Sequence, residues 1–222
     1  MNDRDSTLGT WRIPSELSEK LASYSDYGQL RALPKHQTLY EQGETSTKFY
    51  FVTSGLIQVS ITRVDGSEVI LELMGPQTIC GEGPALDGQP RFSRAVSVLP
   101  TEVVEFDANK LAPLFQRDPD FAVTLLRVAS LKQRVLAVRL EHLTCREPEE
   151  RIVDLLARLR QMCSKRHAGG DLLATYLTHE QIASMTGTSR VTVTRTLGRL
   201  RQYGMIDILN HRILIKSLSC VA

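Results

Sequence analysis

The sequence predicts an α+β fold with an N-terminal antiparallel β-barrel (jelly roll), a long helix and a C-terminal winged helix-turn-helix. Residues 28–112 contain short β-rich runs separated by glycine and proline turns, a pattern typical of such barrels. After Pro119 the apolar spacing lengthens from two residues to about 3.6, the period of a helix. Residues 177–200 have the spacing of two short crossing helices. These three observations define the fold class.

Length and composition fit two modest domains. The chain has 222 residues, of which 42% are hydrophobic and 23% charged, as in ordinary soluble globular proteins. We expect a helical lead-in at residues 1–27 and the barrel at 28–116. The long helix is expected at 117–145 and the winged helix-turn-helix at 146–222.

The lead-in and the barrel strands have local signals. Pro14 marks a helix start, and Leu17 and Leu21 lie four residues apart on one helix face. Asp65-Gly66 separates two strand candidates and predicts a two-residue hairpin turn. The expected strands span residues 49–52, 56–61, 69–73, 95–99 and 102–106.

The long helix has two apolar seams. A helix with two seams needs two surfaces to pack on, and the barrel can cover one of them. The same helix of a second chain is the simplest cover for the other, so we expect a homodimer through residues 119–143; the alternative is one wide stripe against a single core. The barrel-facing seam is Phe121, Val128, Leu131, Val135 and Val138. The expected dimer interface is Leu126, Ala129, Gln133, Leu136, Leu140 and Leu143.

The charge is uneven along the chain. The formal net charge is +2, but residues 186–216 carry six basic side chains against Asp207 alone. That segment is therefore +5, and the remainder sums to −3. A basic patch at one end of a nearly neutral chain indicates a polyanionic partner.

Several classes of protein are not expected. No run of 18 apolar residues exists, which argues against a membrane span, and the polar N-terminus lacks the apolar core of a signal peptide. The cysteines show no CxxC spacing, so we expect reduced thiols, no metal site and a cytoplasmic protein. The four are Cys80, Cys145, Cys163 and Cys220.

Residues 177–200 predict a helix-turn-helix. Thr178 with Gln181 three residues later forms a capping box for the first helix. Gly187 permits the sharp turn, and Ser189 caps the second helix. The second helix turns Val193, Leu197 and Leu200 inward and presents Arg190, Thr194, Arg195 and Arg199 outward. Residues 206–209 and 212–215 around Asn210-His211 then predict a hairpin wing.

A basic outer face on the second helix suits double-stranded DNA. A recognition helix lies in the major groove, where arginine bonds guanine and hydroxyl groups reach phosphate. The alternative is an amphipathic helix with a solvated basic face. The candidate DNA-binding residues are Thr188, Ser189, Arg190, Val191, Thr192, Thr194, Arg195 and Arg199.

An enzyme is not expected. His179-Glu180 resembles the start of the HExxH zinc motif, but Ala183 stands where the second histidine is needed. No GxSxG nucleophile motif exists, and the five histidines are scattered.

With these parts in place, the chain resembles the CRP/FNR superfamily of bacterial transcription regulators over nearly its whole length. The resemblance implies a cyclic-nucleotide-binding-type barrel that senses an effector, a dimerisation helix and a DNA-binding winged helix, with RNA polymerase as a further partner. It rests on Tyr40-Glu41-Gln42-Gly43-Glu44, Val52-Thr53-Ser54-Gly55, Asp65-Gly66-Ser67-Glu68, Gly81-Glu82, Leu86-Asp87-Gly88-Gln89-Pro90-Arg91 and, most firmly, Thr188-Ser189-Arg190-Val191-Thr192-Val193-Thr194-Arg195.

The resemblance implies an effector site between the barrel and the long helix. Its candidate residues are Gly81, Glu82, Arg91, Ser93 and Lys132. In cyclic-AMP receptors a serine follows the arginine and a Thr-Ser pair faces the adenine, whereas this chain has Phe92 and Leu136-Ala137. We therefore expect a small anion such as 2-oxoglutarate, held by Arg91 and Lys132, rather than a cyclic nucleotide. No other cofactor is expected.

The DNA-binding half is similar to the cyanobacterial global nitrogen regulator, which senses 2-oxoglutarate. That similarity implies a pseudo-palindromic promoter site of the GTA-N8-TAC type. In the sensor half, Lys132 and Ala137 replace that branch's arginine and glutamate. Four alternatives stay open: a regulator of the cyclic-AMP receptor type, a constitutive one in which Arg91 pairs with Glu82, a redox switch at Cys80, and a cyclic-nucleotide module that binds no DNA.

Overall fold

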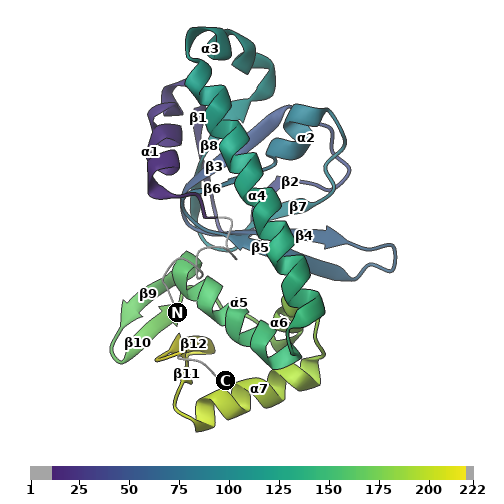
Figure 1. Cartoon of the computed structure of the whole chain (residues 1–222), viewed down its shortest axis with the longest axis vertical. Helices are drawn as coiled ribbons and strands as arrows, with labels where there is room; N and C mark the ends of the chain where they lie inside the picture. The colour runs from purple at the N-terminus through teal and green to yellow at the C-terminus, as the bar shows by residue number, and fades with distance from the viewer. Residues whose placement is uncertain (1–11, 219–222) are drawn as a thin grey trace. The chain divides into compact units, whose positions relative to one another are not determined.

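The computed structural model describes residues 12–218. It confirms the α+β architecture, with strands in the first part, one long helix and a helix-turn-helix with a hairpin at the end (Figure 1). Contacts divide the described chain into two compact units, residues 12–136 and 137–218. The division falls inside the long helix α4 (Pro119–Cys145), which is continuous along the chain.

The first unit contains two four-stranded antiparallel sheets, ordered β1-β8-β3-β6 and β2-β7-β4-β5. The structure confirms the five expected strands, and adds three that had no separate signal in the sequence: β1, β2 and β6. The strands are β1 (Gln29–Leu33), β2 (Thr38–Tyr40), β3 (Lys48–Ser54), β4 (Ile57–Thr62), β5 (Glu68–Met74), β6 (Thr78–Cys80), β7 (Arg94–Ser97) and β8 (Thr101–Asp107).

Strand β3 is buried on both faces of its sheet. Its side chains alternate, so Phe49 and Phe51 pack under helices while Tyr50 and Val52 pack between the sheets. All four are buried, and full burial of each apolar side chain contributes roughly 1.5–3 kcal/mol. The strand is therefore a near-continuous apolar run and not an alternating one.

Helices cover the outer face of the β1-β8-β3-β6 sheet. Buried residues of α1, α3 and α4 form one cluster with the outward side chains of β3 and β8 (Figure 1). The predicted helix near Pro14 is confirmed as α1, whereas residues 1–11 of the expected lead-in lie outside the described part. The remaining helical segments of this unit are α1 (Ser15–Ser23), η1 (Ser25–Tyr27), α2 (Glu82–Asp87), η2 (Ala108–Lys110) and α3 (Leu111–Arg117).

The predicted two-residue turn between β4 and β5 is wrong. The Arg63 amide donates to the Ser67 carbonyl, which leaves three residues in the loop. The Asp65 carboxylate accepts from the Ser67 amide at 2.9 Å. Asp65 therefore bonds the backbone two residues on, and this favours the longer loop.

The second unit has a helical core and one four-stranded sheet, ordered β11-β12-β10-β9. The predicted wing is confirmed, and its Asn210-His211 turn has φ of 48° and 65°, as a two-residue hairpin requires. A second hairpin turns at Ala168-Gly169, with Gly170 paired to His167. The elements are α5 (Pro148–Cys163), β9 (Ser164–His167), β10 (Gly170–Leu173), α6 (His179–Thr186), α7 (Arg190–Gln202), β11 (Ile206–Leu209) and β12 (Arg212–Ile215).

Three other features bear on the sequence expectations. Within residues 12–218, no helix is both long and apolar enough to cross a membrane. In the same range, no cluster of three or more histidine, cysteine, aspartate or glutamate side chains is arranged so that it could hold a metal ion. Cys80 and Cys163 are buried and Cys145 is exposed, whereas Cys220 lies outside the described residues.

Candidate DNA-binding and effector sites

The helix-turn-helix is built from local capping interactions. The Thr178 hydroxyl accepts from the Gln181 amide at 3.1 Å, and the Gln181 side chain accepts from the Thr178 amide at 2.9 Å. The Ser189 hydroxyl accepts from the Thr192 amide at 3.1 Å. Both predicted caps are therefore confirmed, and they satisfy backbone donors that would otherwise be unpaired.

Gly187 joins the two helices in the left-handed conformation, with φ of 61°. A Cβ at this position would lie 3.2 Å from Leu143 Cδ2, so a larger residue would crowd the last turn of α4. Arg151 donates to the carbonyls of both Leu143 and Gly187, at 3.3 and 3.4 Å. The turn is thus fixed to its surroundings by packing and by hydrogen bonds.

Helix α7 has one buried and one exposed face. Val193, Leu197 and Leu200 are buried, as the sequence predicted. The exposed face has a surface hollow lined by Arg190, Val191, Thr194 and Arg195, in which the Val191 side chain is 75% exposed. A single exposed valine is ordinary on a protein surface, so the two arginines, and not the apolar contact, distinguish this face.

Hydroxyl groups on this surface are already ordered by neighbours. Thr188 lies 2.9 Å from the Thr186 hydroxyl, and the Thr192 hydroxyl lies 2.9 Å from that of Ser189. His179 Nδ1 lies 2.8 Å from Thr194 Oγ1, a contact that the sequence did not predict.

The charges on α7 are partly balanced inside the second unit. Glu149 of α5 pairs with Arg199 and lies 3.7 Å from Arg195. Among the described residues, no carboxylate pairs with Arg190. Arg190 is therefore the most available cation at the start of the helix.

A second pair of interactions lies at the base of the wing. Asp207 pairs with Arg201 and Lys216, at 3.5 and 3.3 Å. Hydrogen bonds from the Ile208 amide and from Lys216 lower the pKa of the Asp207 carboxyl. Arg201 and Lys216, two of the six basic residues of the +5 segment, are therefore paired with a carboxylate of the same unit.

Arg91 lies inside the barrel, with an exposed fraction of 1%. Its Nη2 donates to the Lys48 carbonyl at 2.6 Å and its Nη1 to the Gly81 carbonyl at 3.4 Å. Its guanidinium carbon lies 4.1 Å from the centre of the Tyr40 ring. A Cβ at Gly81, whose φ is 79°, would lie 2.6 Å from Nη1, so glycine permits this approach.

Glu82 pairs with Lys132 and not with Arg91. Lys132 Nζ also donates to the Ile79 carbonyl at 2.7 Å, which links α4 to the segment where β6 turns into α2. Both side chains of the pair are largely buried. The Glu82–Arg91 pair that the constitutive alternative needs is therefore absent from the described structure.

Two groups close to Arg91, the Tyr40 hydroxyl and the Cys80 thiol, are neutral. Burial raises the pKa of the Tyr40 hydroxyl, and a hydrogen bond from Ser93 partly offsets the effect. Burial also raises the pKa of the Cys80 thiol to about 12, although Lys132 and Arg91 oppose the shift. At neutral pH this thiol is protonated, and a protonated thiol is a poor nucleophile.

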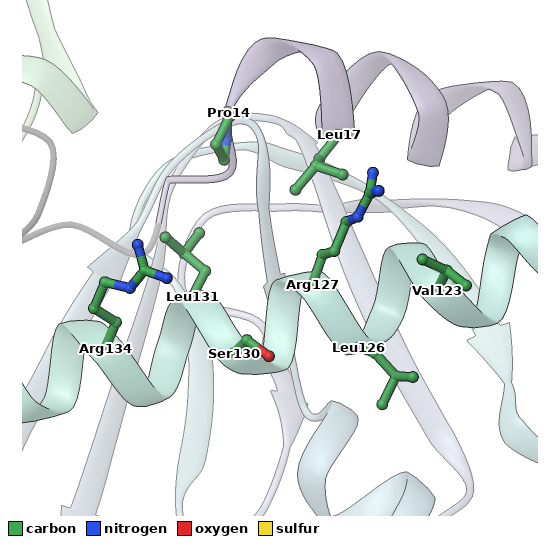
Figure 2. Close-up of a pocket in the computed structure, with 8 residues that line it drawn as sticks. All are labelled: Pro14, Leu17, Val123, Leu126, Arg127, Ser130, Leu131 and Arg134. Carbon is green, nitrogen blue, oxygen red and sulfur yellow. The ribbon is translucent and has the colours of Figure 1, made fainter.

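The α4 seam expected at the dimer interface is exposed to solvent in the single chain, whereas the barrel-facing seam is buried or partly buried. Leu126 and Leu140 are 67% and 64% exposed, whereas Phe121, Val128 and Val135 are buried. A groove beside Leu126 runs between α1 and α4 (Figure 2). Its lining is Pro14, Leu17, Val123, Leu126, Arg127, Ser130, Leu131 and Arg134.

Comparison with known proteins decides the family. Residues 30–118 match the cyclic nucleotide-binding domain, and residues 150–219 match the Crp-like helix-turn-helix domain. The chain is 30% identical over 182 residues to the cyclic AMP receptor protein of Thermus thermophilus, covering 82% of this chain and 81% of that protein. The chain belongs to the CRP/FNR family of transcription regulators.

Other CRP/FNR relatives come from more than one branch. The global nitrogen regulator of Nostoc is 27% identical over 82% of each chain. A solved CRP-family transcriptional regulator from Thermus thermophilus superimposes with a TM-score of 0.71 and 26% identity, covering 85% of this chain and 93% of that one. CRP/FNR proteins are dimeric transcription regulators and not enzymes, and the helix-turn-helix is their DNA-binding part.

Sequence reasoning missed two residues beside the candidate DNA-binding surface. Glu149 and His179 both contact side chains on the exposed face of α7. His179 stood out only as part of a zinc-motif fragment, and Glu149 had no functional signal in the sequence. Both residues are far more than four positions from their α7 partners in the sequence, so helical spacing cannot predict these contacts. Only the packing of α5 and α6 against α7 brings the side chains together.

Proposed function

We propose that the chain is an effector-responsive regulator that binds a GTA-N8-TAC-like promoter site as a homodimer. A small anion in the barrel would set its affinity for DNA. The half-site centres would lie about 10–10.5 bp apart, the spacing at which two recognition helices meet one face of the duplex. Binding of the anion to one of two helix arrangements would shift the population toward the DNA-binding form.

The DNA half of this proposal is supported most by the exposed N-terminal face of α7. Arg190 and Arg195 flank the Val191 hollow, and we assign them the base contacts. Ser189 and Thr192 at the helix start, with Thr188 before them, are assigned to phosphate, where the helix dipole assists. Val191, Thr194 and Arg199 complete the surface. The similarity of residues 188–195 to the nitrogen regulators supports the GTA half-site.

Arg195→Ala should relax sequence preference. Loss of a bidentate guanine contact costs about 1–3 kcal/mol at the base that it reads and leaves contacts elsewhere intact. Selection from a random DNA pool, followed by affinity measurements on single-base variants, measures this. Arg201→Ala is the matched control, because Arg201 lies on the same helix but pairs with Asp207. Unchanged preference in Arg195→Ala, or an asymmetric site for the wild type, would contradict the assignment.

The effector half rests on one observation: the buried Arg91 guanidinium. Among the described residues it bonds carbonyl groups and faces a ring, no carboxylate is paired with it, and its Nε has no hydrogen-bond partner. A buried cation without an anionic partner is costly, and an anionic effector would supply that partner. Lys132 would join Arg91 once an effector competes with Glu82. Gly81 lies beside the guanidinium, and Ser93 hydrogen-bonds the Tyr40 hydroxyl, whose ring faces it.

The fit to a cyclic nucleotide is incomplete. Gly81, Glu82 and Arg91 stand where cyclic-AMP receptors hold the ribose and phosphate, but Glu82 is engaged by Lys132. Phe92 replaces a hydroxyl and is 60% exposed, and Leu136 offers no hydrogen bond to a purine edge. The arrangement therefore favours a compact anion over a nucleotide.

Calorimetry with 2-oxoglutarate and with cyclic AMP should show binding of the dicarboxylate alone. A ligand present at about 100 times its Kd should also raise the unfolding free energy by about 2.7 kcal/mol. Tight cyclic AMP binding that is lost in Glu82→Ala would support the alternative receptor type. Binding of neither ligand would point to another effector, or to a constitutive protein that does not depend on a Glu82–Arg91 pair.

The remaining alternatives have less support. A redox switch needs a reactive thiolate, and the raised pKa of Cys80 disfavours one. A cyclic-nucleotide module that binds no DNA would leave the exposed arginines of α7 without a role. The family resemblance supports RNA polymerase as a partner at promoters. It also supports a cytoplasmic location, because bacterial DNA lies in the cytoplasm.

A further inference from the structure

One carboxylate faces two arginines of the recognition helix. Glu149, the second residue of α5, pairs with Arg199 and lies 3.7 Å from Arg195 Nη2. The two arginines are four residues apart on α7, so their side chains leave the helix on one face. All three side chains remain partly open to solvent. A negative charge thus stands beside the surface assigned to DNA, where phosphates would approach.

We infer that Glu149 is a specificity-determining residue: it weakens binding to arbitrary DNA more than binding to the proper site. The inference rests on the proposed function, which places Arg195 against a base edge. Binding to arbitrary sequence depends almost entirely on attraction between cationic side chains and phosphates. A guanidinium beside a carboxylate attracts a phosphate less strongly, because the two charges of the pair oppose one another.

The two complexes differ in what Arg195 contacts. On arbitrary DNA both Arg195 and Arg199 depend on phosphates, so Glu149 weakens both contacts. At the proper site Arg195 bonds a neutral base edge, and only Arg199 depends on phosphate. A guanidinium has five N–H donors, so two can serve guanine while another stays with Glu149. The carboxylate therefore leaves the base contact intact and also holds Arg195 in position.

Glu149→Gln tests this with a matched control one residue away. Glu150 accepts from the Glu147 amide in the capping box of α5, a role that glutamine also fills. Glu150→Gln therefore makes the same change in net charge without touching the arginines. Glu149→Asp keeps a charge at the start of α5 but shortens its reach by one methylene, and should change binding in the same direction as Glu149→Gln.

The probes are a duplex selected from a random pool by the wild-type protein and a scrambled duplex of equal composition. Fluorescence anisotropy of the full-length protein across a salt series gives both affinities. Glu149→Gln should bind the scrambled duplex about threefold to tenfold more tightly, with a log–log salt slope steeper by about one to two. Its affinity for the selected duplex should rise less, so discrimination falls, while Glu150→Gln keeps the wild-type ratio.

The outcomes separate this inference from the function on which it rests. A wild-type protein that prefers no duplex refutes the proposed function and this role with it. If the wild type discriminates and Glu149→Gln raises both affinities equally, or matches Glu150→Gln, only the role of Glu149 is refuted. Weaker binding to both duplexes with a lower unfolding temperature, in both Glu149 variants, would make Glu149 a structural residue and also overturn the inference.

Discussion

Leu140→Glu should produce a monomeric protein that has lost its affinity for the palindromic site. Leu140 is 64% exposed in the single chain and belongs to the open seam of α4. A two-fold interface would bury the new carboxylate twice, and each buried, unpaired charge costs several kcal/mol. Because linking two half-site contacts raises affinity about 10²–10⁴-fold, a monomer should lose that factor. Light scattering and a mobility-shift assay measure the two effects.

Ser130→Glu is the matched control for this change. Ser130 is exposed on α4 but lies off the seam, beside Arg127 and Arg134 in the groove lining. Its variant should stay dimeric and bind DNA as the wild type does. Leu136→Glu should reproduce the Leu140→Glu result. A dimeric Leu140→Glu protein would place the interface on another surface.

Arg91→Met should abolish binding of the anionic effector and lower the stability of the barrel. Removing one partner of a buried charge pair typically costs about 2–5 kcal/mol of binding, which makes the effector affinity undetectable unless it is very tight. The variant also removes the guanidinium donor of the Lys48 carbonyl, whereas the Gly81 carbonyl still accepts from the Ala85 amide. A buried carbonyl that loses its donor costs about 1–3 kcal/mol. Calorimetry with 2-oxoglutarate and thermal unfolding separate the two losses.

Arg94→Met shows whether the effect is specific to Arg91. Arg94 lies three residues later, is 39% exposed and pairs with Glu41 at 3.0 Å. Its replacement removes the same charge from the same region but leaves the buried guanidinium in place, so effector binding should persist. Arg91→Lys should bind weakly, because lysine keeps the charge without the fork. Unaltered binding in Arg91→Met would move the effector site elsewhere.

The helix-turn-helix could be read from the sequence because its rules act over a few residues. Thr178 and Ser189 lie beside the amides they cap, and Gly187 takes a conformation that disfavours other residues. The inward set of α7 repeats at helical spacing. The wing turn at Asn210-His211 likewise depends on two adjacent residues.

The barrel was only partly predictable. Strands β2 and β6 have three residues each, too few for a period to appear, and they exist because longer neighbours pair with them. Asp65-Gly66 matched the signature of a two-residue turn, but the hydrogen bond from Ser67 to the Asp65 side chain accompanies a longer loop. In both places a non-local or side-chain contact outweighed the local pattern.

The sequence by itself determined the positions of α1, α4, α6 and α7, which seam of α4 the barrel leaves uncovered and which face of α7 is basic, since periodicity and capping are local. Tertiary structure decided how the charges are distributed. It paired Lys132 with Glu82, left Arg91 among carbonyls, and placed Glu149 beside Arg195 and Arg199. Apart from Gly81, which is 10 residues from Arg91, the partners in these contacts are 43–50 residues apart. Electrostatic interaction depends on distance in space and on burial, which sequence spacing does not encode.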